Sequence, residues 1–166
     1  MRSNEVWALD TTYIPKARGF VYLSAVVDGA SRRLLTHKVA TTLKACHAVE
    51  ITEQAFVRFG LPEIVNTGQG SQFTASEFTN AALNKGCGLS MDGRGAWRDN
   101  VFVKRVWRSA KYERIYLKAY DGVAAARADI ADYFTGYNTK RPHSSLNRMT
   151  PKQTSMNLLP ELAMAA

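Results

Sequence analysis

The chain has 166 residues, of which 46% are hydrophobic and 22% charged; this suits one compact domain with a buried core and excludes a wholly disordered chain. Its 22 Lys and Arg residues against 14 Asp and Glu residues give a net charge of +8, which favours a polyanionic partner, either nucleic acid or an anionic membrane surface. Two cysteines without paired spacing exclude a disulfide scaffold and a zinc-ligand cluster, and neither a signal peptide nor an apolar run of transmembrane length is present, so we expect a cytoplasmic protein.

The N-terminal part of the chain predicts three strands joined by turns. Residues 6–14, 20–28 and 32–40 are rich in β-branched and aromatic side chains, and turn-forming residues separate them at 15–19 and 29–31. Because the connections are short, we expect the three strands to form an antiparallel meander.

The following segment switches to a helical period. Apolar side chains recur every three or four positions in residues 43–59, which predicts an amphipathic helix. Residues 63–66 form a short buried strand, and a helical crossover before it indicates that it lies parallel to the first strand. Thr74 and Glu77 have the spacing of a capping box at the start of another helix, and residues 87–91 make a last strand.

A long helix with Asp99 as its N-cap is predicted next, followed by a helix over residues 121–137 and an extended tail from Arg141. This order of elements is that of an RNase H-like α/β fold, a five-stranded mixed sheet of three antiparallel and two parallel strands flanked by helices. We expect one domain over residues 1–150 and a C-terminal tail over residues 151–166.

Five motifs follow one another along the chain. They are WALDTTYIP at 7–15, GFVYLSAVVD at 19–28, GSQFT at 70–74, GAWRDN at 95–100 and RPH at 141–143. In this order and spacing the series resembles the integrase-type catalytic core of bacterial insertion-sequence transposases, which belong to the retroviral-integrase superfamily. The resemblance extends over nearly the whole chain, from about residue 6 to residue 151.

This resemblance implies a two-metal strand-transfer site for DNA integration and transposition. In such enzymes two aspartates and one glutamate hold two Mg²⁺ or Mn²⁺ ions that activate the attacking oxygen and stabilise the leaving oxygen. Asp10 matches the first aspartate, whereas the second and third positions fall on Gly68 and Lys104 with the family's interval of 35 residues between them. We therefore expect Asp10 as the one remaining metal ligand, doubtful metal binding, and an inactive catalytic-core homologue.

Basic side chains recur on and after the long helix. They are candidate contacts to the DNA backbone, although a solvated helix face is the alternative, and comprise Arg98, Lys104, Arg105, Arg108, Lys111 and Arg141. We interpret His143 as a loop or DNA-contacting residue rather than a metal ligand, and Tyr13, Phe20 and Tyr22 as packing of the sheet rather than a recognition surface.

Two alternatives to the inactive homologue remain open. The first is a DNA-binding or oligomerising remnant that modulates active transposase, and the second is a metal-dependent nuclease that uses Asp10 with another acid. The candidate acids, which we interpret as cap, turn and surface residues, are Asp28, Asp92, Asp99 and Glu113. The expected partners are DNA and a second copy of this chain or a full-length transposase, with no membrane. No helix-turn-helix precedes the first strand, so recognition of element ends is expected outside this chain.

Overall fold

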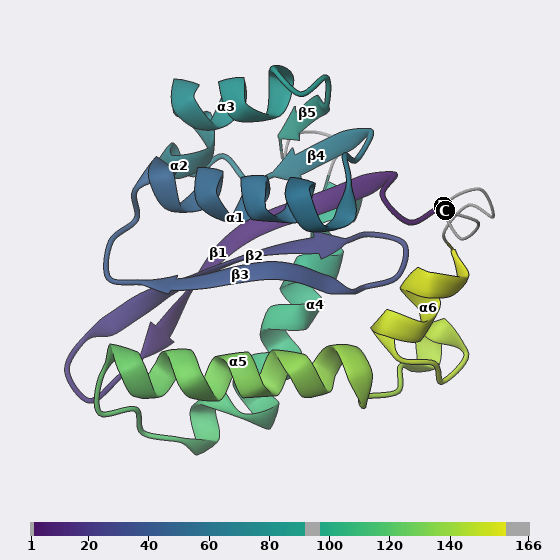
Figure 1. The fold of residues 1–166 in the computed structure, drawn as a ribbon. Helices are drawn as coiled ribbons and strands as arrows, with labels where there is room; N and C mark the ends of the chain where they lie inside the picture. Colours follow the sequence, from purple (N-terminus) through teal and green to yellow (C-terminus); the bar gives the residue numbers. More distant parts are fainter. Residues whose placement is uncertain (1, 92–96, 159–166) are drawn as a thin grey trace.

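A mixed β-sheet forms the centre of the molecule (Figure 1). The computed structural model describes residues 2–91 and 97–158, and for residues 97–100 it describes the backbone alone. Within these ranges five strands form one sheet in the order β3-β2-β1-β4-β5: β1 (Val6–Pro15), β2 (Phe20–Asp28), β3 (Leu34–Ala40), β4 (Ile64–Thr67) and β5 (Gly88–Met91). The first three strands are antiparallel, and β4 and β5 run parallel to β1, which confirms the predicted RNase H-like sheet.

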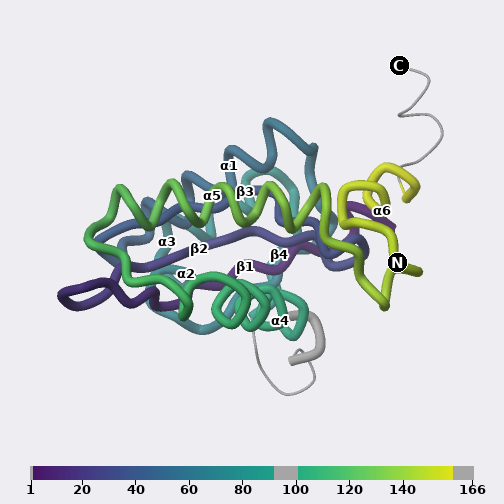
Figure 2. Tube along the Cα trace, turned by 90° about the horizontal axis from the view of Figure 1, so that it is seen from below, coloured from purple at the N-terminus to yellow at the C-terminus, as the bar shows by residue number. Residues whose placement is uncertain are grey.

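Helices cover both faces of this sheet (Figures 1 and 2). On one face lie α1 (Ala45–Phe59), α2 (Ser71–Thr74) and α3 (Ser76–Leu83), and on the other lie α4 (Trp97–Glu113) and α5 (Val123–Thr139). The chain closes with the 3-10 turns η1 (Ile115–Leu117) and η2 (Ser144–Leu146) and with α6 (Pro151–Asn157). None of the helices in the described part of the chain is long and apolar enough to span a bilayer.

Side-chain alternation along β1 determines which residues face which layer. Trp7 and Leu9 are fully buried in the core that includes α1 and α3. Ala8, between them, is fully buried in the other core, which includes α4 and α5. Asp10 therefore projects from β1 toward α4.

Two predictions about helix starts were wrong. The capping box of Thr74 and Glu77 does not form, because Ala75 is extended (ψ 140) and ends α2, so that α3 begins only at Ser76. Asp99 is not an N-cap, since α4 already begins at Trp97.

The segment after Arg141 is not an extended tail but folds into η2 and α6. Thr150 caps α6 in a complete capping box with Gln153, and Pro151 occupies the first turn, where its missing N–H is tolerated. Ser3 donates a hydrogen bond to the backbone oxygen of Ser155 at 3.2 Å, which ties α6 to the N-terminal segment. The division into a domain over 1–150 and a tail over 151–166 stays a prediction.

Acid sensitivity is expected from His37 on β3, whose ring packs edge-to-face on Phe134 of α5 with ring centroids 5.1 Å apart. Burial lowers the pKa of His37 from its ordinary 6.5. The unfolded chain therefore binds the proton more readily, so stability is full above pH 6.5 and declines as the pH falls toward the lowered folded pKa. We expect His37→Gln to lose less stability than the unsubstituted chain between about pH 7 and about pH 5.5 in urea unfolding. An unchanged pH dependence would contradict this prediction.

Candidate active site

Asp10 lies in the middle of the central strand, beside the end of β4. It pairs with Ala25 of β2, and the last paired residues of β1 and β4 are Leu9 and Thr67. The chain leaves β4 at Gly68, where an added Cβ atom would lie 3.8 Å from Asp10 Oδ1, an ordinary van der Waals distance. Positions 10 and 68 are therefore neighbours on the face of the sheet that α4 covers.

Two side chains of α4 reach this part of β1. The buried indole of Trp107 donates a hydrogen bond from Nε1 to Asp10 Oδ2 at 3.1 Å. Lys111 donates from Nζ to Thr12 Oγ1 at 2.6 Å. Burial lowers the pKa of Lys111, and the nearby Asp10 carboxylate opposes that shift. From the first contact to the second, the chain moves four residues along α4, from Trp107 to Lys111, and two residues along β1. Both steps advance by about 6 to 7 Å, so α4 and β1 run in the same direction across this contact.

Lys104 lies one turn before Trp107 on the same side of α4, because residues three apart are neighbours on a helix. Its side chain is exposed, and it forms no hydrogen bond or ion pair with any other residue that the structure describes. Its ammonium group is therefore open to solvent.

Arg105 and Arg108 are also exposed on α4. The charge of Arg105 adds to burial in lowering the pKa of Arg32, which precedes β3 in the β2–β3 turn. The Arg32 guanidinium stacks over the ring of Phe102 at 3.4 Å from its centroid. A basic surface thus extends from α4 onto this turn.

The remaining predicted DNA contacts have different settings. Arg141 forms an ion pair with Glu113 at 2.7 Å, and its guanidinium lies beside the His143 ring, which packs edge-to-face on Tyr137. Lys111 points inward to Thr12 and is half-buried, in contrast to the outward Arg108. The side chain of Arg98 lies outside the described residues.

The acids that were candidates to join Asp10 hold other positions. Asp28 is buried and accepts hydrogen bonds from the backbone N–H and hydroxyl of Ser31 at 3.1 and 2.6 Å, which makes it a turn-stabilising residue. For Glu113 burial alone would raise the pKa, but hydrogen bonds from Arg141 and Tyr133 lower it. Asp92 and the Asp99 side chain lie outside the described residues, and among those described no three His, Cys, Asp or Glu side chains group as metal ligands.

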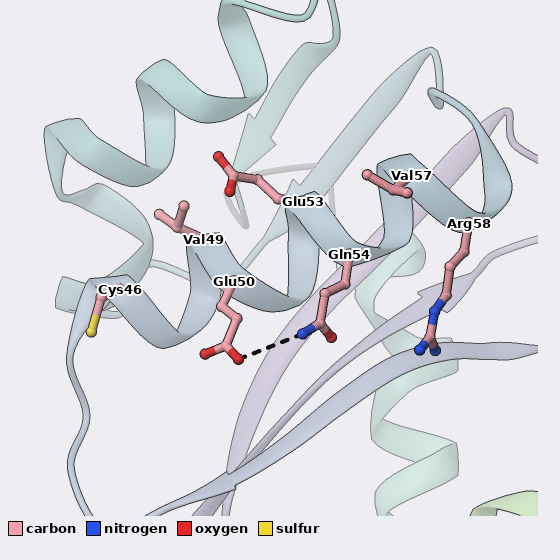
Figure 3. A pocket seen from close by; sticks show the side chains of 7 residues that line it. All are labelled: Cys46, Val49, Glu50, Glu53, Gln54, Val57 and Arg58. Atoms are coloured by element: carbon pink, nitrogen blue, oxygen red, sulfur yellow. Dashed lines mark hydrogen bonds between the residues drawn. The ribbon is translucent and has the colours of Figure 1, made fainter.

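A surface pocket on the opposite side of the sheet likewise holds no group of metal ligands among the described residues (Figure 3). Every residue that lines it belongs to α1, from Cys46 to Arg58. Of its two acids, Glu50 accepts a hydrogen bond from Gln54 at 3.5 Å and pairs with Lys38. The pocket is a groove along one helix, separated from Asp10 by the sheet.

Two residues that contribute to the surroundings of α4 were not singled out from the sequence. Trp107 was not among the predicted site residues, although its position three residues after Lys104 indicates that it lies on the same side of the helix. Arg32 was not among the predicted basic contacts, and no local pattern in the sequence brings it beside Phe102.

Family comparisons agree with this architecture. The integrase core domain family matches residues 1–96, and a second integrase core domain family matches residues 85–151. The transposase for insertion sequence element IS904 of Lactococcus lactis subsp. lactis is 31% identical over 156 residues, which cover 90% of this chain and 60% of that protein. Transposase InsF for insertion sequence IS3A of Escherichia coli is 28% identical over 153 residues, which cover 90% of this chain and 53% of that protein. The chain thus spans little more than half the length of these relatives.

Solved structures show the same fold at lower identity. The catalytic core domain of BIV integrase superposes with a TM-score of 0.72 at 17% identity, covering 93% of this chain and 95% of that one. The dimeric form of the HTLV-2 integrase catalytic core in complex with magnesium superposes with a TM-score of 0.65 at 19% identity, covering 93% and 98%. By its sequence and its fold, this chain belongs to the integrase core domain family and is a homologue of the catalytic cores of insertion-sequence transposases.

Proposed function

We propose that this core binds DNA along α4 and does not catalyse strand transfer. The observation that carries the proposal is the position of Gly68, whose Cα carries no ligand although an added Cβ would lie 3.8 Å from Asp10 Oδ1. In the family's scheme a carboxylate at this position shares a metal ion with the first aspartate. Here the backbone supports such a pair, but the second side chain is missing.

The donor set around Asp10 does not fit a pair of divalent ions. Mg²⁺ prefers several oxygen ligands, and three carboxylates supply the charge that two ions require. In this chain Asp10 Oδ2 already accepts a hydrogen bond from the Trp107 indole N–H. Position 104, one helical turn before Trp107, carries an ammonium group. A cation at Lys104 repels metal ions, and no step through a bound metal follows from these residues.

DNA binding is supported by exposed positive charges on α4. Lys104, Arg105 and Arg108 are exposed there, and the chain as a whole carries +8. Flexible cations on an exposed helix suit contacts to phosphates, which position a duplex without reading its sequence. We propose that a second copy of this chain or a full-length transposase shares such DNA, which would let this chain modulate an active enzyme.

The test is duplex binding by fluorescence anisotropy at several salt concentrations. Arg105→Gln with Arg108→Gln is expected to weaken binding and to reduce the slope of log affinity against log salt by about 1 for each lost phosphate contact. Lys152→Gln on α6, also an exposed position, is the matched control and is expected to change neither quantity. Equal losses in both variants would contradict binding along α4.

Cleavage is tested separately with DNA that bears element ends, in Mg²⁺ or Mn²⁺. We expect no nicking or joining above the level of an Asp10→Ala variant. Nicking by the unsubstituted chain that Asp10→Ala abolishes would refute the proposed inactivity and favour the metal-dependent nuclease instead.

A further inference from the structure

Three aromatic rings lie together at the open end of the β1–β2 hairpin, two of them exposed and the third half-buried. We call Tyr13, Phe20 and Tyr22 the hairpin cluster. Tyr13 is 58% exposed and Phe20 52% exposed, so the rings that were predicted as packing of the sheet pack on one another at its surface and not in a buried core. In Figures 1 and 2 the turn between β1 and β2 projects from one end of the molecule.

The hairpin is covered on one side and open on the other. Ile14 and Val21 are fully buried in the core beneath α4 and α5, and the backbone N–H of Ala17 donates to the carbonyl of Tyr120 at 2.8 Å. By alternation Tyr13 projects from the opposite side, the one that α1 covers farther along the sheet. The strands extend beyond α1 there (Figure 1), which leaves the rings in solvent.

The three rings hold one another in a fixed arrangement. Tyr13 lies 5.0 Å from Phe20 and 5.4 Å from Tyr22, and Phe20 lies 5.7 Å from Tyr22, all measured between ring centroids. These are favourable aromatic distances, so little side-chain freedom remains to be lost when a flat ligand is bound. An exposed, ordered group of large apolar side chains commonly marks a binding surface.

The charge around the hairpin cluster identifies the class of ligand. Residues 11–27 contain no Asp or Glu, and the turn carries Lys16 and the exposed Arg18. Stacking rings beside positive charges are the combination that binds unpaired nucleic-acid strands. A symmetric contact between two copies would instead bring like charges together, which disfavours a second copy as the occupant.

We propose that the hairpin cluster is a stacking site for an unpaired DNA strand, with Lys16 and Arg18 near its phosphates. The site lies on the side of the sheet opposite Asp10 and α4. It is thus separate from the duplex-binding surface proposed above and does not depend on it.

The experiment compares Tyr13→Leu with Phe20→Leu, as a double variant, against the unsubstituted 166-residue chain. Leucine keeps the surface apolar but removes the planar rings. We expect affinity for a short oligo(dT) to fall about tenfold or more, since each stacked base contributes strongly, while affinity for a duplex stays unchanged. Arg105→Gln with Arg108→Gln is expected to show the reverse pattern, which separates failure of this site from failure of binding along α4.

Photo-crosslinking of the unsubstituted chain provides a second readout that does not depend on a variant's folding. An oligonucleotide with 5-iododeoxyuridine is expected to crosslink to the peptide that carries Tyr13, Phe20 or Tyr22, as mapped by mass spectrometry. Crosslinks confined to other peptides, or unchanged oligo(dT) affinity in the leucine variant, would overturn the proposal. Tighter binding of an equally long oligo(U), or self-association in sedimentation that the leucine variant loses, would overturn it in favour of RNA or a second copy.

Discussion

Replacing Gly68 by Asp and Lys104 by Glu in one chain is expected to create divalent-metal binding. The new carboxylate at position 68 would start from a Cβ 3.8 Å from Asp10 Oδ1, with its backbone already in place. Without metal the added negative charges repel Asp10, so we expect the double variant to be less stable than the unsubstituted chain in EDTA. In Mn²⁺ at about one hundred times the dissociation constant the gain is about 2.7 kcal/mol, or about 5–10 °C in melting temperature for a chain of this size.

Thermal melts in EDTA and in Mn²⁺ measure this effect, and the paramagnetism of Mn²⁺ gives an independent binding signal. The unsubstituted chain is expected to melt at the same temperature in both conditions. Adding Asp10→Asn to the double variant should remove the metal-dependent gain, because the first ligand is then lost. A double variant that melts identically with and without Mn²⁺ would show that positions 10, 68 and 104 do not form one metal site.

Trp107→Ala is expected to destabilise the fold by about 3–5 kcal/mol, the usual cost of removing a buried tryptophan side chain. Trp107 is 6% exposed, belongs to the core beneath α4 and α5, and donates its indole N–H to Asp10. The substitution therefore leaves a cavity and also removes a donor from a partly buried carboxylate. Urea unfolding at constant pH measures the loss of free energy.

Trp107→Phe separates the two contributions. Phenylalanine keeps most of the apolar volume and cannot donate a hydrogen bond, so we expect a loss of about 1.5–3 kcal/mol, typical of hydrogen bonds to charged groups. In a chain that already carries Asp10→Leu, the same Trp107→Phe change should cost less, because the acceptor is absent. Equal costs in the two backgrounds would mean that the indole stabilises the fold by packing alone.

Local signals in the sequence were sufficient for most of the sheet. The meander of β1 to β3 follows from turn residues within each short connection, and β4 is parallel to β1 because α1 must cross over between them. Gly68 could be expected beside Asp10 for the same reason, since parallel strands end at one edge. These inferences depend on the spacing of apolar residues and on the order of the elements along the chain rather than on particular side-chain contacts.

Other features depend on tertiary packing, which local patterns do not contain. Trp107 and Asp10 are 97 positions apart, and the sequence does not say which apolar residue of α4 turns its N–H toward the strand. The Thr74 capping box failed because the backbone at Ala75 is extended between two short helices. Tyr13 has the pattern of a buried strand residue, but its exposure depends on where α1 begins relative to the end of the hairpin.

The hydrogen bond between Trp107 and Asp10 also bears on how this chain changes over generations. In a metal-free protein, the carboxylates of a cation-binding cluster repel one another and destabilise the fold. Such clusters persist because selection for activity outweighs their cost in stability. Here Asp10 has an indole donor on one side and a glycine on the other. If the chain is inactive, as we propose, selection for a stable fold alone would not favour carboxylates at positions 68 and 104, and the sequence would drift farther from catalysis while its sheet and both cores are retained.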